Sequence, residues 1–471
     1  MKRLILLLAL PLALFAQVEV DTIIDLGHYL FNGHYIPEFN KLYVMAPYRL
    51  IALECSTWQV TAEYPHEALY GGARFAWNPL RQKLYVSFWN VNTRDSMLVV
   101  YPDADTARWV SPALYAPTYV ASRDLLYGNV PKPGHNNLLA LDCKTDSVVK
   151  TIPPPIPGFE NGFRVSWDSV GDRVYSSVVA WGAPGRLAVY DVASDSMLAL
   201  IELNCASPLK LTFHDRLRKA YFVSDGIFAP LRAGVIDTDS LSLIKFLFQA
   251  HGYGYCNEGR GPVALNTLMD KVYFGGNSAN RPLPTNCTLH VVNRKDSIIR
   301  RIGYIGRGAH GYAVWIPWSN RVYFDVHDVA HMAVLDCETD SLIIPELVLP
   351  GQHRPPLDIL LDPVRERIFA IGADTTAIHV LRDVPAGVAE GRGPGPRPAA
   401  PLRIAPNPAR NRVRLAGTES AGLYAPDGRR VAALTPGDND VSRLVPGLYF
   451  VRKGPGAGRG ASDVIKVVIA R

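Results

Sequence analysis

Residues 126–149 contain, in order, Leu126-Tyr127, an apolar stretch from Leu138 to Leu141, the turn Asp142-Cys143-Lys144-Thr145-Asp146-Ser147, and the pair Val148-Val149. Short apolar stretches divided by Asp, Asn, Gly and Pro are typical of β-strands joined by tight turns. In the repeats with the same pattern, a further apolar stretch comes before the aromatic strand, as in Phe163 to Trp167. The pattern therefore predicts a unit of four short strands.

This unit recurs along most of the chain. A strand of the form Leu/Val-Tyr-Val/Phe or a close variant appears eight times, with aromatic residues 42 to 52 positions apart, at Tyr43, Tyr85, Tyr127, Tyr175, Tyr221, Tyr273, Tyr323 and Phe369. Four strands per repeat of this length are typical of a propeller blade, because a closed ring of sheets buries the apolar faces of each sheet. The sequence predicts an all-β, eight-bladed β-propeller over residues 17–385. Seven blades is the alternative if one repeat is degenerate, and an open solenoid is the competing architecture.

The two ends of the repeat region indicate how the ring closes. The eighth repeat ends with Ile378 to Leu381 and lacks its outer strand, whereas Val18 to Leu26 reads as a lone strand of the missing kind. A closed ring leaves no unpaired sheet edge at its ends. We therefore expect the first strand to complete the last blade.

The repeats resemble the YVTN-type β-propellers of bacterial and archaeal surface proteins. The likeness rests on the aromatic strand followed by an Asp-x-x-Thr/Ser-Asp-Ser turn, as in Asp142 to Ser147, and it covers roughly residues 17–385. A calcium loop needs six or more converging oxygens, so Asx-type hairpin turns explain these aspartates better. The motif is structural and implies no chemistry of its own.

The beginning of the chain reads as an export signal. Lys2-Arg3 precede an apolar run from Leu4 to Phe15 that ends at Ala16. This order of basic, apolar and small residues is typical of a secretory signal peptide over residues 1–16. The alternative, a membrane anchor, needs about 20 apolar residues. No later stretch is long and apolar enough to span a membrane, so we expect no transmembrane anchor after the signal is removed.

The net charge of +6 is located at the two ends of the chain. Residues 402–471 contain twelve Lys/Arg against five Asp/Glu, and the stretch between the signal and this region is slightly acidic. A nucleic-acid-binding protein concentrates basic residues on its binding domain. The large middle region has no such concentration, so we expect no nucleic-acid partner.

The C-terminal part differs in composition. Residues 386–401 are rich in Gly and Pro and have no periodicity, which indicates a linker. Beyond it, alternating apolar stretches are divided by Pro-Asp-Gly and Pro-Gly turns, as in Gly422 to Tyr424 and Leu448 to Arg452. This pattern predicts a small antiparallel Ig-like β-sandwich over residues 402–471.

Several motifs of this region occur in the order found in one family. They resemble the type A C-terminal sorting domain of the type IX (Por) secretion system, and the matching positions are Asn407, Pro408, Asp427, Gly428, Pro446, Gly447 and Tyr449. The resemblance covers nearly all of residues 402–471, although the glycine-rich insert Gly454 to Gly460 departs from it. It implies export across the outer membrane of a Gram-negative-type bacterium by the type IX machinery, and a secreted or surface-attached product. A generic Ig-like adhesive module is the alternative, but it does not explain the place at the chain end.

The six cysteines give no metal-site spacing. Cys55, Cys143 and Cys337 occupy matching positions just after strands in three repeats, so we expect small buried apolar side chains there. Cys256 and Cys287 flank one repeat, which leaves open a disulfide between them in an oxidising compartment. His327 and His331 fall in a predicted loop, where their spacing does not bring them together. We predict no metal and no cofactor.

The loops that lead into the innermost strands are the usual binding place of a propeller. Alignment of these strands places seven residues at comparable positions: Arg74, Thr118, Arg164, Lys210, Asn266, Trp315 and Asp358. Arg74, Arg164 and Lys210 would form a partly basic funnel for an anionic ligand at the mouth of the central channel. Alternatively, these are polar residues that only face solvent in the channel. A register error of one residue would turn each side chain to the other face.

Two classes of function follow. The sequence contains no Gly-x-Ser-x-Gly elbow, P-loop or dinucleotide fingerprint. We therefore favour a non-catalytic surface platform that binds a protein, a glycan or a small ligand. The alternative is a secreted propeller enzyme, a lyase or hydrolase with scattered residues at the channel mouth, which the fold alone does not exclude. A quinoprotein dehydrogenase is a more distant alternative, because its tryptophan-docking motif cannot be placed.

Overall fold

The computed structural model describes residues 17–66, 73–88, 96–130, 137–180, 184–205, 211–224, 231–250, 263–278, 286–302, 313–326, 331–351, 356–372, 376–384, 403–405, 412–416, 421–425, 430–435, 437–444, 447–453 and 464–469. The proposed signal peptide and linker lie outside these ranges. The chain divides into two compact units, Met1–Gly387 and Val388–Arg471. None of the helices in the described ranges is long and apolar enough to cross a membrane.

The first unit contains eight four-stranded antiparallel sheets, numbered here as blades 1 to 8. Blades 1 to 4 comprise β2 (Gly33–Ile36), β3 (Lys41–Ala46), β4 (Arg49–Glu54) and β5 (Gln59–Pro65); β6 (Ala73–Asn78), β7 (Lys83–Phe88), β8 (Met97–Tyr101) and β9 (Thr106–Val110); β10 (Tyr115–Val120), β11 (Leu125–Asn129), β12 (Leu138–Asp142) and β13 (Ser147–Ile152); and β14 (Glu160–Asp168), β15 (Arg173–Val179), β16 (Arg186–Asp191) and β17 (Met197–Glu202).

Blades 5 to 8 follow the same order. They comprise β18 (Thr212–His214), β19 (Lys219–Val223), β20 (Leu231–Asp237) and β21 (Ser242–Ala250), with the 3-10 turn η1 (Asp215–Leu217) after β18; β22 (Val263–Asn266), β23 (Lys271–Ser278), β24 (Asn286–Val292) and β25 (Ile298–Ile302); β26 (Ala313–Ile316), β27 (Arg321–Val326), β28 (His331–Asp336) and β29 (Ser341–Val348); and β30 (Pro356–Asp362), β31 (Arg367–Gly372), β32 (Ala377–Val384) and β1 (Gln17–Asp25).

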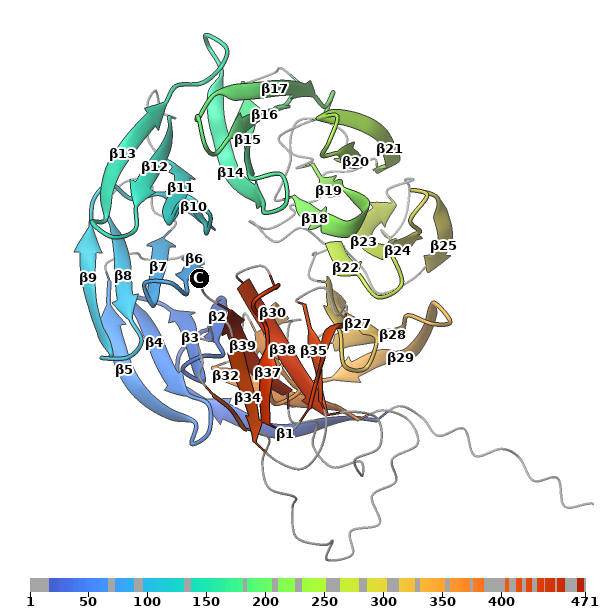
Figure 1. Cartoon of the computed structure of the whole chain (residues 1–471). Coiled ribbons are helices and arrows are strands. Elements are labelled where there is room, and N and C mark those ends of the chain that lie inside the picture. Colours follow the sequence, from blue (N-terminus) through green and yellow to red (C-terminus); the bar gives the residue numbers. More distant parts are fainter. Residues whose placement is uncertain are drawn as a thin grey trace, which may run out of the picture. The chain divides into compact units, whose positions relative to one another are not determined.

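The blades form a ring in which the first strand of each repeat lies innermost (Figure 1). Blade 8 takes its outermost strand from the start of the chain, since β1 pairs antiparallel with β32 from Gln17↔Val384 to Asp25↔Ala377. The prediction of an eight-bladed propeller closed by the first strand is confirmed. The seven-bladed alternative and the open solenoid are wrong.

Among the described residues, eight hydrophobic clusters lie between neighbouring blades, one for each contact between blades. The cluster that closes the ring joins Leu42 and Ile51 of blade 1 to Phe369 and Val380 of blade 8. The other seven clusters join the remaining neighbours in the same way. Each sheet therefore buries both faces against its neighbours, which a single sheet cannot do alone.

The hairpin turns explain the repeated Asp residues. In the turn after β12, Asp142 Oδ1 accepts hydrogen bonds from the backbone N–H groups of Lys144 (2.6 Å) and Thr145 (3.1 Å). Asp146 then adopts a left-handed conformation with φ of 54°, which Asp tolerates better than most residues. Asp191, Asp237 and Asp336 accept the same kind of backbone hydrogen bond in blades 4, 5 and 7. These contacts match the predicted Asx-type turns.

The second Asp of the turn serves another purpose, because it binds the neighbouring blade. Tyr85 of blade 2 donates a hydrogen bond of 2.7 Å to Asp146 of blade 3, and Lys83 Nζ lies 2.8 Å from the same carboxylate. We call this contact from one blade to the next a blade latch. Six pairs of neighbours have a latch to a carboxylate: Lys41 with Asp105, Lys83 with Asp146, Tyr127 with Asp195, Lys219 with Asp296, Lys271 with Asp340, and Arg321 with Asp383. In the other two pairs an arginine of one blade donates to a backbone carbonyl of the next: Arg173 to Thr238 and Arg367 to Cys55.

The four cysteines whose side chains the structure describes are buried thiols. Cys55, Cys143 and Cys337 lie in three different clusters between blades, as predicted, and Cys205 is buried as well. Burial raises the pKa of Cys55 to about 12 and the pKa values of Cys143 and Cys337 to about 11. These thiols therefore stay neutral and act as apolar side chains.

The second unit contains a three-stranded and a four-stranded sheet. The first consists of β33 (Arg403–Ala405), β34 (Arg412–Ala416) and β37 (Gly437–Asp440), and the second of β36 (Arg430–Leu434), β35 (Ala421–Tyr424), β38 (Gly447–Lys453) and β39 (Val464–Ile469). One cluster joins Val413 and Leu415 of the first sheet to Leu423, Val451 and Val467 of the second. The two sheets therefore share one apolar core.

Candidate functional site

Three neighbouring blades carry two of the three predicted basic residues on their innermost strands. Arg74 lies on β6 of blade 2 and Arg164 on β14 of blade 4, and β10 of blade 3 lies between these strands and contacts both. We call this part of the ring, formed by β6, β10 and β14, the inner wall. Figure 1 shows the three strands at the inner edge of their blades, next to the centre of the ring.

Irregular backbone on two of these strands brings an aromatic ring and an arginine together. The pairing of β10 with β11 shifts between Tyr115 and Thr118, and the pairing of β14 with β15 shifts between Asn161 and Val165. Such bulges redirect side chains and are frequent beside binding sites. Here the guanidinium carbon of Arg164 lies 6.0 Å from the centre of the Tyr115 ring, within the range of a cation–π contact.

The backbone of the bulge in β10 is strained. Ala116 has a φ of 46°, in the left-handed region that alanine rarely adopts. Residues held in such conformations cost about 1–3 kcal/mol each and cluster at functional sites. The strained residue directly follows Tyr115, the residue whose ring contacts Arg164.

The strands behind the inner wall add a layer of buried polar residues. Ser87 pairs in register with Arg74, Asn129 with Tyr115, and Ser177 exchanges hydrogen bonds of 3.4 and 3.5 Å with the backbone of Arg164. All three are at most 2% exposed. The equivalent positions of blades 1, 5 and 8 hold Met45, Val223 and Ile371, so this polar lining distinguishes blades 2 to 4 from those blades.

The pairing register corrects the alignment of the seven predicted wall residues. Arg74, Arg164 and Asp358 lie at one level, nine residues before the second strand of their blades. Thr118, Asn266 and Trp315 lie nearer the hairpin, where they pair with Tyr127, Lys271 and Val322. Asn266 caps its turn by accepting hydrogen bonds from the N–H groups of Leu268 and Met269, both 3.0 Å. Lys210 lies outside the described residues.

Blade 8 is acidic at this level. Asp358 is fully buried, and its Oδ2 accepts a hydrogen bond of 2.9 Å from the backbone N–H of Gly33 in blade 1. The inner strand of blade 1 bonds that of blade 2 in the same way, through the Asn32 amide and the backbone of Ala73. The ring of innermost strands is therefore not uniformly basic, and the described basic residues at this level lie on blades 2 and 4.

Other predicted residues have separate outcomes. Cys256, Asn407, Pro408, Asp427, Gly428 and Pro446 lie outside the described residues, and for Cys287 and Gly447 the structure describes the backbone alone. Tyr449 lies in β38 and packs in the apolar core of the second unit. His331 is not in a loop: it begins β28, is about one-fifth exposed, and its Nδ1 lies 3.9 Å from Glu346 Oε2. The strand starts earlier than its apolar residues indicate.

Sequence reasoning missed Tyr115, Ser87, Asn129 and Ser177. The three polar residues each stand two positions after the repeated tyrosine, so the repeat alignment contained the signal. Tyr115 could not be found in this way, because the bulge that positions it has no sequence signature. Within the described ranges, no three His, Cys, Asp or Glu side chains are grouped so that they could hold a metal ion.

The inner wall is suited to binding an anion. Arginine keeps its charge when it is buried, and its planar group bonds carboxylate, sulfate or phosphate through two parallel hydrogen bonds. Arg164 is only 9% exposed, whereas Arg74 is more open to solvent. The two positive charges therefore lie on the same wall, and Arg74 is the more accessible of the two.

No protein-family model matches the chain, and no curated protein matches it. Among solved structures, it is similar to the β-propeller domain of Cps50 (Swd1) from Myceliophteria thermophila, with 11% sequence identity and a TM-score of 0.46, over 77% of this chain and 99% of that one. The fold assignment itself rests on the strand order of the eight sheets.

Proposed function

We propose that the protein is an exported β-propeller that binds an acidic ligand at its inner wall and acts as a non-catalytic platform. The observation that carries the proposal is the contact between Arg164 and Tyr115, produced by bulges in two successive innermost strands. Arg74 lies on the neighbouring strand β6. Buried Ser87 and Asn129 pair in register with Arg74 and Tyr115, and Ser177 bonds the backbone of Arg164. Carboxylate-bearing glycans and acidic peptides fit this chemistry.

Binding of the purified full chain to an array of carboxylated and neutral oligosaccharides tests the ligand class. We expect binding to the carboxylated members, weaker binding at higher salt because the ions screen the charges, and a loss of about tenfold or more in Arg74→Gln. The matched control is Arg49→Gln, which removes a positive charge from an exposed pair with Glu63 in blade 1. Equal binding by Arg74→Gln and Arg49→Gln would refute a role for the inner wall.

We further propose that the second unit is an Ig-like sandwich of the type IX sorting class, and that residues 1–16 are a signal peptide. The support is the resemblance of residues 402–471 to that class, together with two sheets that share one apolar core. In a bacterium with a type IX system, we expect the full chain to reach the cell exterior and a chain ending at residue 401 to stay in the periplasm. Export of the shortened chain would contradict this proposal.

A further inference from the structure

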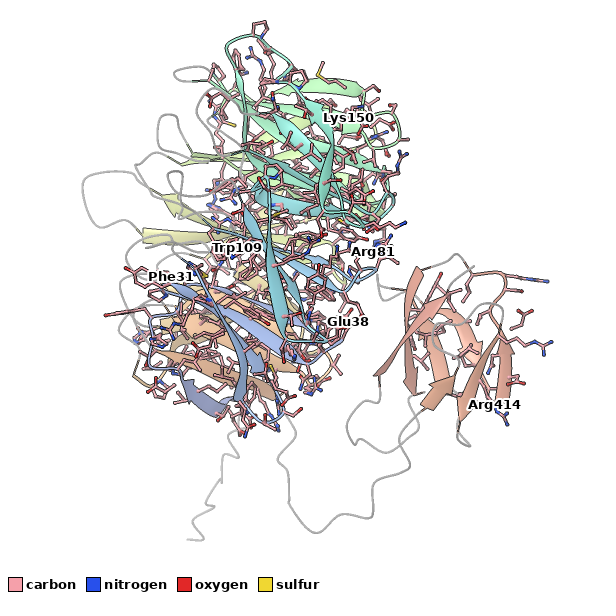
Figure 2. All side chains as sticks on the ribbon, turned by 90° about the vertical axis from the view of Figure 1, so that its left-hand side faces the viewer. Phe31, Glu38, Arg81, Trp109, Lys150 and Arg414 are labelled. Carbon is pink, nitrogen blue, oxygen red and sulfur yellow. The ribbon has the colours of Figure 1, made fainter. Side chains whose placement is uncertain are left out.

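The turns between the first and second strands of the blades form a ring at one face of the propeller. Each turn has four residues and ends at a residue with positive φ, such as Asn40, Gln82 or Asp270. In Figure 2, Glu38 and Arg81 of two such turns lie at one edge of the propeller, and Phe31, which precedes β2, lies at the opposite edge. The second turn residue of blades 1 to 8 is, in order, Glu38, Leu80, Ser122, Val170, Arg216, Leu268, Trp318 and Val364.

Every second blade presents a large exposed apolar side chain at this position. Leu80, Val170, Leu268 and Val364 of blades 2, 4, 6 and 8 are 65%, 57%, 67% and 56% exposed. A single exposed apolar residue needs no explanation, but here one recurs at the same turn position of four alternate blades. The ring of second turn residues is called the turn ring below.

The charged members of the turn ring lie on opposite sides of the propeller. Glu38 belongs to blade 1 and Arg216 to blade 5, four blades away in a ring of eight, and both are exposed. Outside the turn ring, the turns between the third and fourth strands reach the same face, because successive strands reverse direction. Their exposed residues include Asp103, Lys144, Asp239 and Glu338, so a polar rim surrounds an apolar centre, as in many protein interfaces.

We propose that the turn ring binds the turn ring of a second copy of this chain, around a two-fold axis through blades 3 and 7. A two-fold axis in the plane of contact reverses the order of blades in the partner. Blade 1 then faces blade 5, blade 2 faces blade 4, and blade 6 faces blade 8. Glu38 of each copy then faces Arg216 of the other copy. Leu80 faces Val170 of the other copy, and Leu268 faces Val364.

Other arrangements of two such rings fit less well. An axis through blades 1 and 5 sets Glu38 against Glu38 and Arg216 against Arg216, and like charges in an interface cost several kcal/mol. An axis that passes between blades sets each exposed Leu or Val against a second turn residue of an odd-numbered blade, among them Glu38 and Arg216. The axis through blades 3 and 7 is the one that pairs opposite charges and apolar side chains together.

Sedimentation velocity of the full chain over a range of concentrations tests the dimer. We expect a concentration-dependent dimer, and a dissociation constant raised by about a hundredfold or more in Leu80→Asp/Leu268→Asp, because each new charge enters the contact twice. The matched control is Val149→Asp on the outer strand β13, where the side chain is 55% exposed. A wild-type chain that stays monomeric to about 100 µM, or a dimer unaffected by the Leu substitutions, overturns the proposal.

A charge exchange tests the axis itself. Glu38→Arg and Arg216→Glu should each weaken the homodimer by about tenfold or more, since each places like charges together. An equal mixture of the two variants should form a heterodimer about as stable as the wild-type dimer, because both contacts are then complementary. Arg216 also contacts Asp270 in its own chain, so the circular dichroism of each variant is compared with the wild type. Folded variants that fail to recover in the mixture overturn the proposed axis.

Discussion

The blade latch at Asp146 gives the sharpest test of how the ring is held together. The Asp146 side chain is 1% exposed and receives Lys83, Tyr85 and Arg108. Replacement by Ala leaves the Lys83 ammonium, itself 9% exposed, without its carboxylate. Breaking a buried ion pair from one side costs about 3–5 kcal/mol, so we expect the free energy of unfolding to fall by about that amount in Asp146→Ala.

A double-mutant cycle separates the latch from ordinary packing. Tyr85→Phe loses one hydrogen bond to a charged group, which costs about 1.5–3 kcal/mol. In Asp146→Ala the Tyr85 hydroxyl has already lost its carboxylate, so the double variant should be no less stable than Asp146→Ala alone. Urea unfolding of the full chain, followed by tryptophan fluorescence, gives the four free energies.

The control is Asp103→Ala, an exposed residue in the equivalent turn of blade 2, for which we expect a change within about 0.5 kcal/mol. Additive effects of Tyr85→Phe and Asp146→Ala would refute the latch, because additivity means that the two side chains do not act together.

Further measurements address the closure of the ring and its buried groups. Burial lowers the pKa values of His66 and His290 to about 4. Between pH 6.5 and 4, the unfolded chain therefore binds more protons than the folded one. The free energy of unfolding should fall by about 2 kcal/mol per histidine from pH 7 to pH 5. His66→Gln/His290→Gln should flatten this pH dependence, whatever its effect on stability at pH 7; an unchanged slope would assign it to other groups. A chain that begins at residue 27 loses β1 and exposes the edge of β32, so size-exclusion chromatography should show aggregation, and a monomer with the unfolding midpoint of the intact chain would contradict the closure. In a Cys256→Ser/Cys287→Ser variant, four thiols remain: Cys55, Cys143, Cys205 and Cys337. Because burial raises the pKa of each, they should not react with a disulfide reagent at pH 8 until urea is added. Reaction in the native state would show that the clusters open.

The repeats could be predicted because the strands and turns of each blade are formed by consecutive residues, so the pattern can be seen within one repeat. The aromatic strand, the Asp-Ser turn and the missing eighth outer strand were enough to predict the blade number and the role of β1. The latches were hidden, because Tyr85 and Asp146 belong to different repeats and meet only when two blades pack.

The inner wall was found in part for a physical reason. Arg74 and Arg164 lie at one level because each stands nine residues before the second strand of its blade. Thr118 pairs with Tyr127 on the regular side of the β10 bulge, so it lies two positions nearer the hairpin than Arg74, which pairs with Ser87. Bulges have no periodic pattern, so the contact between Arg164 and Tyr115 could be seen only in the structure.

The pairing of β1 with β32 also sets the order of events during synthesis. Val20 pairs with Leu381, so the N-terminal strand has no partner until almost the whole propeller has left the ribosome. During that interval its apolar side chains are available to other chains and to chaperones.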